Sequence, residues 1–215
     1  MKKAVIFDLD GTLLDTLTDI MESVNIVLKR YGFPTHDLDA YKYFIGSGIS
    51  VLTQKAFPSF ISEREFAVYL SEVMREYEAR QTLRTKPYDG IMEMLERLNN
   101  EGVKIAILSN KPDEFAKPTV AHFFPNIKFE VVFGSRENVA RKPAPDAVFE
   151  ILDILNLHKE DCYFVGDTST DMRTAVSAGV DAIGVSWGFR TVEELKGAGA
   201  RYIIDHPKEL VDIIS

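Results

Sequence analysis

Short apolar runs alternate with helical patterns along most of this 215-residue chain. The apolar runs are "AVIF" (4–7), "VKIAIL" (103–108), "FEVVFGS" (129–135), "CYFVGD" (162–167), "DAIGVS" (181–186) and "RYIID" (201–205). The helical patterns between them cover 91–102, 113–123, 146–157, 170–178 and 191–198. Buried strands that alternate with helices favour a parallel sheet with right-handed crossovers. We therefore predict the α/β class, with a doubly wound parallel sheet as its core.

One long stretch interrupts this alternation. Residues 16–83 contain helical spacing, as in "EREFAVYLSEVMREYEAR", but no strand pattern. The stretch lies between the first strand and all the others. We therefore predict an all-helical domain, 16–83, inserted into a core formed by 1–15 and 84–215. The segments "DTLT" (15–18) and "TLRTKP" (82–87) would be its hinges.

The composition is that of an ordinary water-soluble protein and limits the partners to expect. Hydrophobic residues make up 46% of the chain, charged residues 27%, and the net charge is −8. An acidic chain does not attract nucleic acid or an anionic membrane by its overall field. The single cysteine rules out a disulfide within the chain, and no apolar stretch has the length of a signal core or membrane span. We therefore expect a cytoplasmic protein without nucleic-acid or membrane partners.

Polar residues follow the carboxyl ends of four of the predicted strands. In open parallel sheets, ligands bind beyond the carboxyl ends of the strands. Because all four strand ends can lie on one edge of the sheet, we expect these polar groups to converge there. They are Asp8, Asp10, Gly11 and Thr12; Ser109, Asn110 and Lys111; Lys142; and Asp167 with Asp171.

This set of residue types points to phosphoryl transfer. Four carboxylates in one cleft repel one another and cannot all stay ionised unaided. A divalent cation relieves the repulsion, and a set of oxygen ligands suits Mg²⁺. Lys142 adds a positive charge, and Ser109 offers a hydroxyl beside the N–H groups of a helix start, which favour anions. A carboxylate nucleophile with these neighbours is typical of catalysis through an aspartyl-phosphate.

The sequence resembles the haloacid dehalogenase superfamily of phosphatases, and within it the phosphoglycolate phosphatase-like branch. The matching motifs are "DLDGT" (8–12), "SN" (109–110), "KP" (142–143) and "GDTSTD" (166–171), in the order that the family shows. The resemblance covers nearly the whole chain. It implies a Rossmann-like core, a helical cap domain at 16–83, and hydrolysis of a small phosphate monoester.

The resemblance also implies a role for each matching residue. Asp8 attacks phosphorus, while Asp10 protonates the leaving oxygen and then activates water. Mg²⁺ is bound by Asp8, by the backbone carbonyl of Asp10 and by Asp167. Asp171 orders the waters of the metal and pairs with Lys142.

Further residues bind the phosphoryl group or the rest of the substrate. The resemblance implies that Ser109, Lys142, Gly11 and the Asn110 backbone hold the transferring group, and that Gly11 and Thr12 shape a moving loop. The segment "FIGSGIS", with Gly46, Ser47 and Gly48, would be the cap loop that enters the active site; its glycines also suit a plain helix–helix turn. In the cap, Tyr41, Lys42, Tyr43 and Arg64 are candidates to contact the leaving group.

Several alternatives remain open at this point. A sugar phosphomutase or a pyrophosphatase of the same superfamily would use the same motifs, although Thr12 favours a phosphatase over a mutase. A dehalogenase is disfavoured because that branch lacks the second aspartate, Asp10. A non-catalytic phospho-acceptor switch has similar acidic strand ends but is about half this length. We predict a Mg²⁺-dependent phosphatase for a small phosphorylated metabolite, as a monomer or homodimer.

Overall fold

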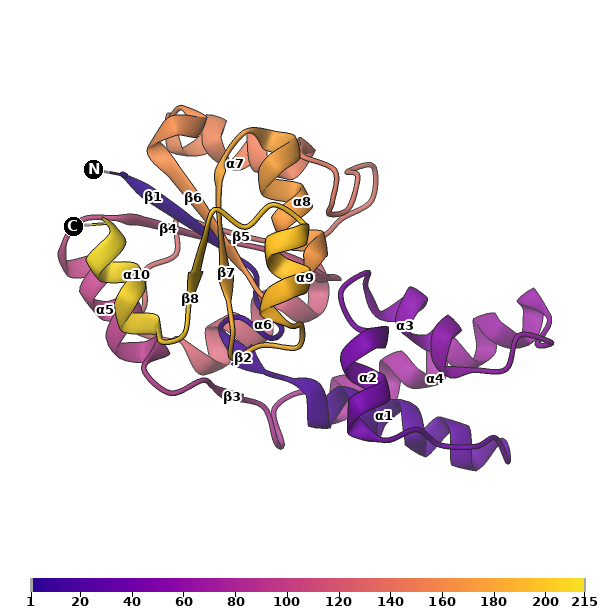
Figure 1. The fold of residues 1–215 in the computed structure, drawn as a ribbon. Helices are drawn as coiled ribbons and strands as arrows, with labels where there is room; N and C mark the ends of the chain where they lie inside the picture. Colours follow the sequence, from indigo (N-terminus) through magenta and orange to yellow (C-terminus); the bar gives the residue numbers. More distant parts are fainter. Residues whose placement is uncertain (1, 215) are drawn as a thin grey trace.

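The computed structural model describes residues 2–214, and its centre is a six-stranded parallel sheet (Figure 1). Its strands lie in the spatial order β5-β4-β1-β6-β7-β8. From β1 the chain proceeds to β4 and β5, and from β6 it runs the opposite way, which opens a crevice at the carboxyl ends of β1 and β6. The strands are β1 (Ala4–Phe7), β4 (Lys104–Pro112), β5 (Val131–Ser135), β6 (Cys162–Gly166), β7 (Asp181–Val185) and β8 (Tyr202–Ile204).

Helices cover both faces of this sheet, because alternate residues of each strand point to opposite sides. In β1, Val5 and Phe7 belong to one buried cluster, whereas Ala4 and Ile6 belong to another. The first cluster includes residues of α5 (Ile91–Asn100), α6 (Asp113–Phe123) and α10 (Pro207–Ile214). The second includes residues of α7 (Asp146–Leu155), α8 (Ser169–Ala178) and α9 (Val192–Gly197). The predicted doubly wound α/β core is therefore confirmed.

Four helices stand between β1 and α5 in the chain and pack on one another at one side of the sheet (Figure 1). We call residues 17–80 the helical insert. Its own buried cluster joins Val24, Tyr41, Leu52 and Val73, and it extends to Phe115 and Phe189 of the core. The helices are α1 (Leu17–Arg30), α2 (Leu38–Phe44), α3 (Ile49–Ala56) and α4 (Glu63–Arg80). A helical insert is thus confirmed, while its exact boundaries at 16 and 83 remain a prediction.

Two short features join the insert to the core at the predicted hinges. The antiparallel pair of β2 (Leu14–Asp15) and β3 (Lys86–Pro87) holds the two connecting segments side by side. Asp19 of α1 is fully buried and accepts hydrogen bonds from the backbone N–H groups of Arg84 and Thr85 and from the Thr85 hydroxyl. The entry and exit of the insert are therefore fixed to each other.

The end of β4 differs from the prediction. The apolar run was expected to stop at residue 108, but β4 continues to Pro112. Its pairing with β5 shifts register after Leu108, and this irregularity carries Ser109, Asn110 and Lys111 beyond the regular sheet. A separate observation concerns the helices: none within residues 2–214 is both long and apolar enough to cross a bilayer.

Candidate active site

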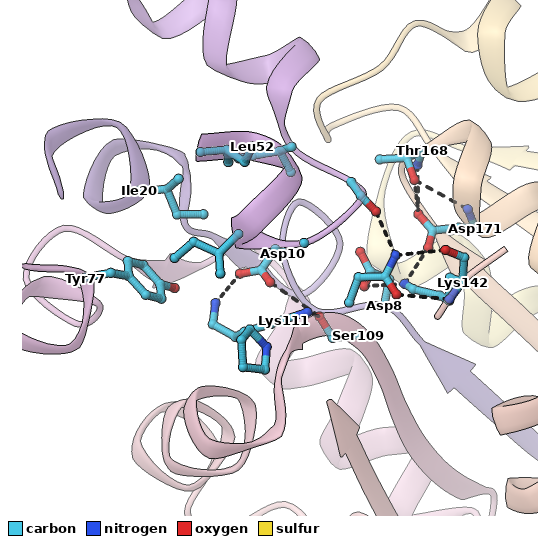
Figure 2. A pocket seen from close by; sticks show the side chains of 16 residues that line it. Asp8, Asp10, Ile20, Leu52, Tyr77, Ser109, Lys111, Lys142, Thr168 and Asp171 are labelled. Atoms are coloured by element: carbon cyan, nitrogen blue, oxygen red, sulfur yellow. Dashed lines mark hydrogen bonds and ion pairs between the residues drawn. The ribbon is translucent and has the colours of Figure 1, made fainter. Parts of the chain in front are cut away.

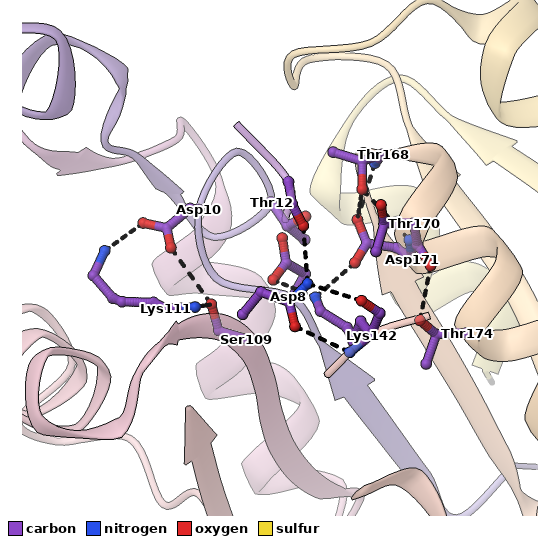
Figure 3. A network of polar contacts seen from close by, with 12 residues as sticks. Asp8, Asp10, Thr12, Ser109, Lys111, Lys142, Thr168, Thr170, Asp171 and Thr174 are labelled. Carbon is purple, nitrogen blue, oxygen red and sulfur yellow. Dashed lines mark hydrogen bonds and ion pairs between the residues drawn. The ribbon is translucent and has the colours of Figure 1, made fainter. Parts of the chain in front are cut away.

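Asp8 lies directly after β1 and forms the centre of a buried polar network (Figure 3). Lys142 Nζ donates to Asp8 Oδ1 at 2.7 Å and to Asp171 Oδ1 at 2.7 Å. Only 3% of the Lys142 side chain is exposed, so its charge is balanced by these two carboxylates rather than by solvent. The lysine therefore bridges the ends of two separate segments of the core.

Asn110 holds this lysine in place from β4. The Asn110 side chain accepts from the backbone N–H of Lys142 at 3.0 Å and donates to the Lys142 carbonyl at 3.1 Å. It also donates to the carbonyl of Gly46, in the loop between α2 and α3, at 2.9 Å. The resemblance implied a role for the Asn110 backbone only. The side chain has a structural task of its own, because one amide joins Lys142 to the helical insert.

Asp171 both caps a helix and contacts Lys142. Its Oδ2 accepts from the Thr168 hydroxyl at 2.6 Å and from the Thr168 N–H at 3.0 Å, which forms a capping box at the start of α8. Its Oδ1 remains directed at Lys142. Helix capping and a place in the polar network are therefore combined in one carboxylate.

Asp167 is held by the loop that follows β1 and by the loop that follows β7. The Thr12 hydroxyl donates to Asp167 Oδ1 at 3.1 Å, and the Phe189 N–H donates to Oδ2 at 2.8 Å. A Cβ atom at Gly11 or Gly188 would lie 2.3 or 2.2 Å from the Asp167 side chain, so larger residues do not fit there. Gly11 makes room for Asp167 in this structure, and its role in binding phosphate stays a prediction. Gly188 was not predicted.

These acidic residues form a set that can hold a divalent metal ion. Asp8, Asp167 and Asp171 are buried and each offers an oxygen within 4.8 Å of the others. Burial, followed by the nearby Asp171 and Asp8 charges, raises the pKa of Asp167. Burial also raises the pKa of Asp8 to about 7, with Lys142 acting in the opposite direction. Carboxylates that are costly to ionise together are suited to a hard cation with oxygen ligands.

Asp10 lies on the other side of Asp8 and has partners of its own. Lys111 Nζ donates to Asp10 Oδ1 at 2.5 Å, and the Ser109 hydroxyl lies 3.4 Å from Asp10 Oδ2. The Ser109 oxygen in turn accepts from the Lys111 N–H at 3.1 Å. Burial opposes the charge of Lys111, but Asp10 and Tyr77 outweigh this and raise the pKa of Lys111.

No local pattern predicts a role for Lys111, although it follows the "SN" motif immediately. A lysine at that point looks like a surface residue, yet only 4% of its side chain is exposed. The irregular end of β4 turns it inward toward Asp10. Trp187 is a second residue with a task that its position alone did not reveal, because its indole N–H donates to the Thr12 carbonyl at 3.0 Å.

The insert closes over these residues through the loop between α2 and α3. Asn110 donates to Gly46, and the Arg190 guanidinium donates to the carbonyls of Lys42 and Ile45, at 2.8 Å for the latter. Gly48 approaches the core so closely that a Cβ atom would lie 3.0 Å from the Asn110 carbonyl oxygen. The loop is therefore seated on the core rather than held away from it.

A pocket lies between this loop and the core (Figure 2). Of the predicted substrate loop, Gly46 and Gly48 line the pocket, and Ser47 is not among the lining residues. The four cap residues proposed to contact a leaving group do not line it either; Tyr41, for example, is buried and donates to Asn25, and Lys42 pairs with Asp39. The lining residues are Asp8, Asp10, Ile20, Ile45, Gly46, Gly48, Ile49, Leu52, Tyr77, Ser109, Asn110, Lys111, Pro112, Lys142, Thr168 and Asp171.

Comparisons with known proteins agree with this fold. A family model described as haloacid dehalogenase-like hydrolase matches residues 5–185, and the chain belongs to this family. Its relatives include phosphoglycolate phosphatases, so the chain is a phosphatase of the phosphoglycolate phosphatase-like branch.

Two curated relatives span nearly the whole chain. Phosphoglycolate phosphatase of Colwellia psychrerythraea is 29% identical over 216 residues, which cover 98% of this chain and 96% of that protein. N-acetylmuramic acid 6-phosphate phosphatase of Pseudomonas aeruginosa is 28% identical and covers 99% of this chain and 94% of its own length. A crystal structure from Lactobacillus delbrueckii subsp. bulgaricus, provisionally assigned as a phosphoglycolate phosphatase, has a TM-score of 0.91 and 32% identity, covering 100% of this chain and 99% of that one.

Proposed function

We propose that this enzyme is a Mg²⁺-dependent phosphatase that hydrolyses a small phosphate monoester, phosphoglycolate or a close analogue, through a phosphorylated Asp8. The observation that carries the proposal is the position of Asp8 between two unlike groups of residues. On one side are Lys142 and the carboxylates of Asp167 and Asp171; on the other is Asp10 with its partner Lys111. Such an arrangement suits a nucleophile flanked by an anion-binding site and an acid–base group.

In the first step, a carboxylate oxygen of Asp8 forms a bond to phosphorus as the ester P–O bond breaks. Asp10, which lies across the pocket from Lys142, gives its proton to the leaving alcohol oxygen. In the second step, Asp10 takes a proton from water, whose oxygen attacks phosphorus. The bond between Asp8 and phosphorus then breaks, inorganic phosphate leaves, and both aspartates return to their initial states.

Four further residues support this reaction. Lys142 and the Ser109 hydroxyl line the pocket on either side of Asp8 and would hold the phosphoryl oxygens. Asn110 positions Lys142 through its backbone and so acts indirectly. Lys111 holds Asp10 on the side of the pocket that a leaving group would occupy.

The residues present fit a magnesium ion. Asp8, Asp167 and Asp171 provide converging oxygens. Because Gly11 and Gly188 have no side chain, the Asp167 carboxylate fits between them. We propose Asp8, Asp167 and the Asp10 carbonyl as ligands, with Asp171 close by and engaged with Lys142 and Thr168. When bound, Mg²⁺ would supply positive charge that offsets both the carboxylates and the phosphoryl oxygens.

A pair of aspartate variants tests the proposal. Purified protein should release inorganic phosphate from p-nitrophenyl phosphate and from phosphoglycolate with Mg²⁺, and excess EDTA should stop the release. Asp8→Asn should lose more than about 10⁴-fold in kcat because an amide cannot form the phosphoenzyme. The exposed Asp153 of α7 provides the matched control, since Asp153→Asn should keep wild-type rates.

Two results would contradict the proposal. Full activity in EDTA would exclude the metal-dependent reaction, and an active Asp8→Asn enzyme would show that another group attacks phosphorus. The mutase alternative is distinguished in the same assay, because a mutase yields an isomeric sugar phosphate and requires a bisphosphorylated sugar. Location in the cytoplasm and assembly as a monomer or homodimer remain predictions.

A further inference from the structure

The pocket has two chemically different ends. Figure 2 shows Asp8, Lys142 and Asp171 gathered at one end, while Ile20, Leu52 and Tyr77 lie beyond Asp10 at the other. The proposed reaction puts the phosphoryl group at Asp8 and the leaving alcohol near Asp10. The second end is therefore the place of the leaving group, and its walls decide which alcohol can be accommodated.

The wall that the helical insert provides is almost entirely apolar. Ile20 comes from α1, Ile45 from the loop, and Ile49 and Leu52 from α3. Among the described lining residues of the insert, only Tyr77 has a polar side chain. A leaving group with several hydroxyls would lose its water there and find few partners, which is costly for each unpaired group.

Tyr77 carries a hydrogen-bond donor that no described residue uses. The side chain is 2% exposed, and its hydroxyl has no hydrogen-bond partner at normal distance. Burial raises the pKa of Tyr77 to about 12, so the hydroxyl keeps its proton at neutral pH. A buried donor that faces a pocket and has no acceptor is an exception among protein structures, and a ligand oxygen would satisfy it.

Lys111 brings a positive charge to the same place. Its Nζ lies 5.0 Å from the centroid of the Tyr77 ring and donates to Asp10 Oδ1. An ammonium group has three N–H donors, and this bond uses one of them. Lys111 and Tyr77 together therefore present a cation and an O–H donor to whatever lies beside Asp10.

Building on the proposed function, we propose that Lys111 and Tyr77 are specificity-determining residues that bind a carboxylate on the leaving group. The substrate class is a short phosphate ester whose alcohol has one carboxylate and few or no free hydroxyls. A carboxylate accepts from both donors at once, and the apolar wall contacts the short carbon chain. Polyhydroxylated sugar esters are rejected by the same wall.

Three probe esters with Mg²⁺ measure this selectivity in the full-length protein. They are 2-phosphoglycolate, ethyl phosphate, which replaces the carboxylate by a methyl group, and glucose 6-phosphate. The wild type should prefer phosphoglycolate to ethyl phosphate by about 100-fold or more in kcat/KM, because loss of a charged hydrogen-bonding group leaves buried donors unpaired. Glucose 6-phosphate should be the poorest of the three.

Variants of the two residues test their part in the selectivity. Tyr77→Phe should lower kcat/KM for phosphoglycolate about 10-fold, chiefly through KM, with little effect on ethyl phosphate. Lys111→Met should remove most of the preference, although it also slows both esters because Asp10 loses its partner. Tyr41→Phe is the matched control: Tyr41 is a buried tyrosine of the insert whose hydroxyl bonds to Asn25, away from the pocket, so selectivity should not change.

The outcomes separate this inference from the proposed function. If Tyr77→Phe and Lys111→Met slow both short esters equally, the two residues only support the site and the inference is wrong. A wild type that hydrolyses glucose 6-phosphate or ethyl phosphate best also overturns it, while the proposed phosphatase reaction stands. A wild type that releases no phosphate from any ester, p-nitrophenyl phosphate included, overturns both.

Discussion

The core and the helical insert contribute to the same pocket in opposite ways. The core provides charged side chains whose oxygens and nitrogens are fixed by several partners, as for Lys142 between Asp8 and Asp171. The insert provides branched apolar side chains and a loop that is held through its backbone carbonyls. The charged side chains thus lie at the carboxyl edge of the sheet in the core. The apolar side chains that we propose to select the leaving group by shape and polarity lie on the insert.

This difference indicates how the two regions can vary independently. Carboxylates in a buried cluster depend on one another, so a change in one disturbs the charge balance of all. Apolar wall residues are linked mainly by packing, and volume-conserving exchanges among them cost little. The substrate range of such an enzyme can therefore change through the insert while the chemistry of the core stays the same.

The largest effect is expected where the core chemistry itself is changed. Asp10→Asn should reduce turnover by about 10²–10⁴-fold on every ester, because the general acid and base is lost. An ester with a good leaving group should still phosphorylate Asp8, so a phosphoprotein should accumulate that is sensitive to hydroxylamine and visible by mass spectrometry. The double variant with Asp8→Asn should never carry this label. A label in the double variant would place the phosphoryl group on another residue.

The next largest effect is expected at the junction of the insert and the core, where Asp19 bonds to Arg84 and Thr85. Asp19→Ala removes the acceptor for the partly buried N–H of Arg84 and for the buried N–H and hydroxyl of Thr85, and should cost about 3 kcal/mol of the free energy of unfolding. Urea unfolding measures it. Asp37→Ala is the control within the insert, because Asp37 caps α2 at an exposed site and should cost about 1 kcal/mol. If both variants lose the same free energy of unfolding, the Asp19 contacts stabilise the protein no more than an ordinary helix cap.

A smaller effect should distinguish two glycines of the insert loop. Both have positive φ, +119° at Gly46 and +90° at Gly48, so alanine is strained at either. At Gly48 the new Cβ would also lie 3.0 Å from the Asn110 carbonyl oxygen, whereas at Gly46 the nearest atom is 3.8 Å away. Gly48→Ala should therefore raise KM about 10-fold more than Gly46→Ala, with kcat less affected. If the two variants behave alike, close seating of the loop on the core does not influence binding.

Much of this architecture could be predicted because its signals are local. The apolar runs of β1, β6 and β7, and the helical spacing in α1 and α4, follow from burial on one or both faces. The acidic motifs could be placed on one edge because strand ends in parallel sheets share an edge. The pair β2–β3 escaped prediction since two residues per strand give no periodic pattern.

The residues that could not be predicted act through contacts between distant segments. Lys111 is turned inward by the irregular end of β4. Position 188 needs glycine because the Asp167 side chain lies against it, and Arg190 donates to a backbone carbonyl of the insert. No local pattern marks such contacts. The cap candidates Tyr41 and Lys42 illustrate the converse, because polar side chains suggested substrate contact while their partners lie within the insert itself.

The smallest effect concerns the charge balance of the core site and its dependence on pH. Burial raises the pKa of Asp8 to about 7 and also raises the pKa of Asp167, whereas the pKa of an aspartate in the unfolded chain is about 3.9. Between these values the folded protein binds more protons than the unfolded one, so its stability falls as the pH rises. Carboxylates with a lowered pKa, such as Asp113 and Asp181, titrate below this window and do not cancel the trend.

Magnesium should therefore stabilise the protein more at high pH than at low pH. At about pH 8 these carboxylates carry more negative charge for the ion to offset, whereas at about pH 5 the ion must displace more protons from them. Thermal unfolding with Mg²⁺ and with EDTA should show a gain in Tm that is larger at pH 8 by at least about 2 °C. Asp167→Asn should lose most of this gain, while Asp153→Asn should keep it. A gain that is equal at both pH values, or larger at pH 5, would show that these buried carboxylates are not what the metal ion neutralises.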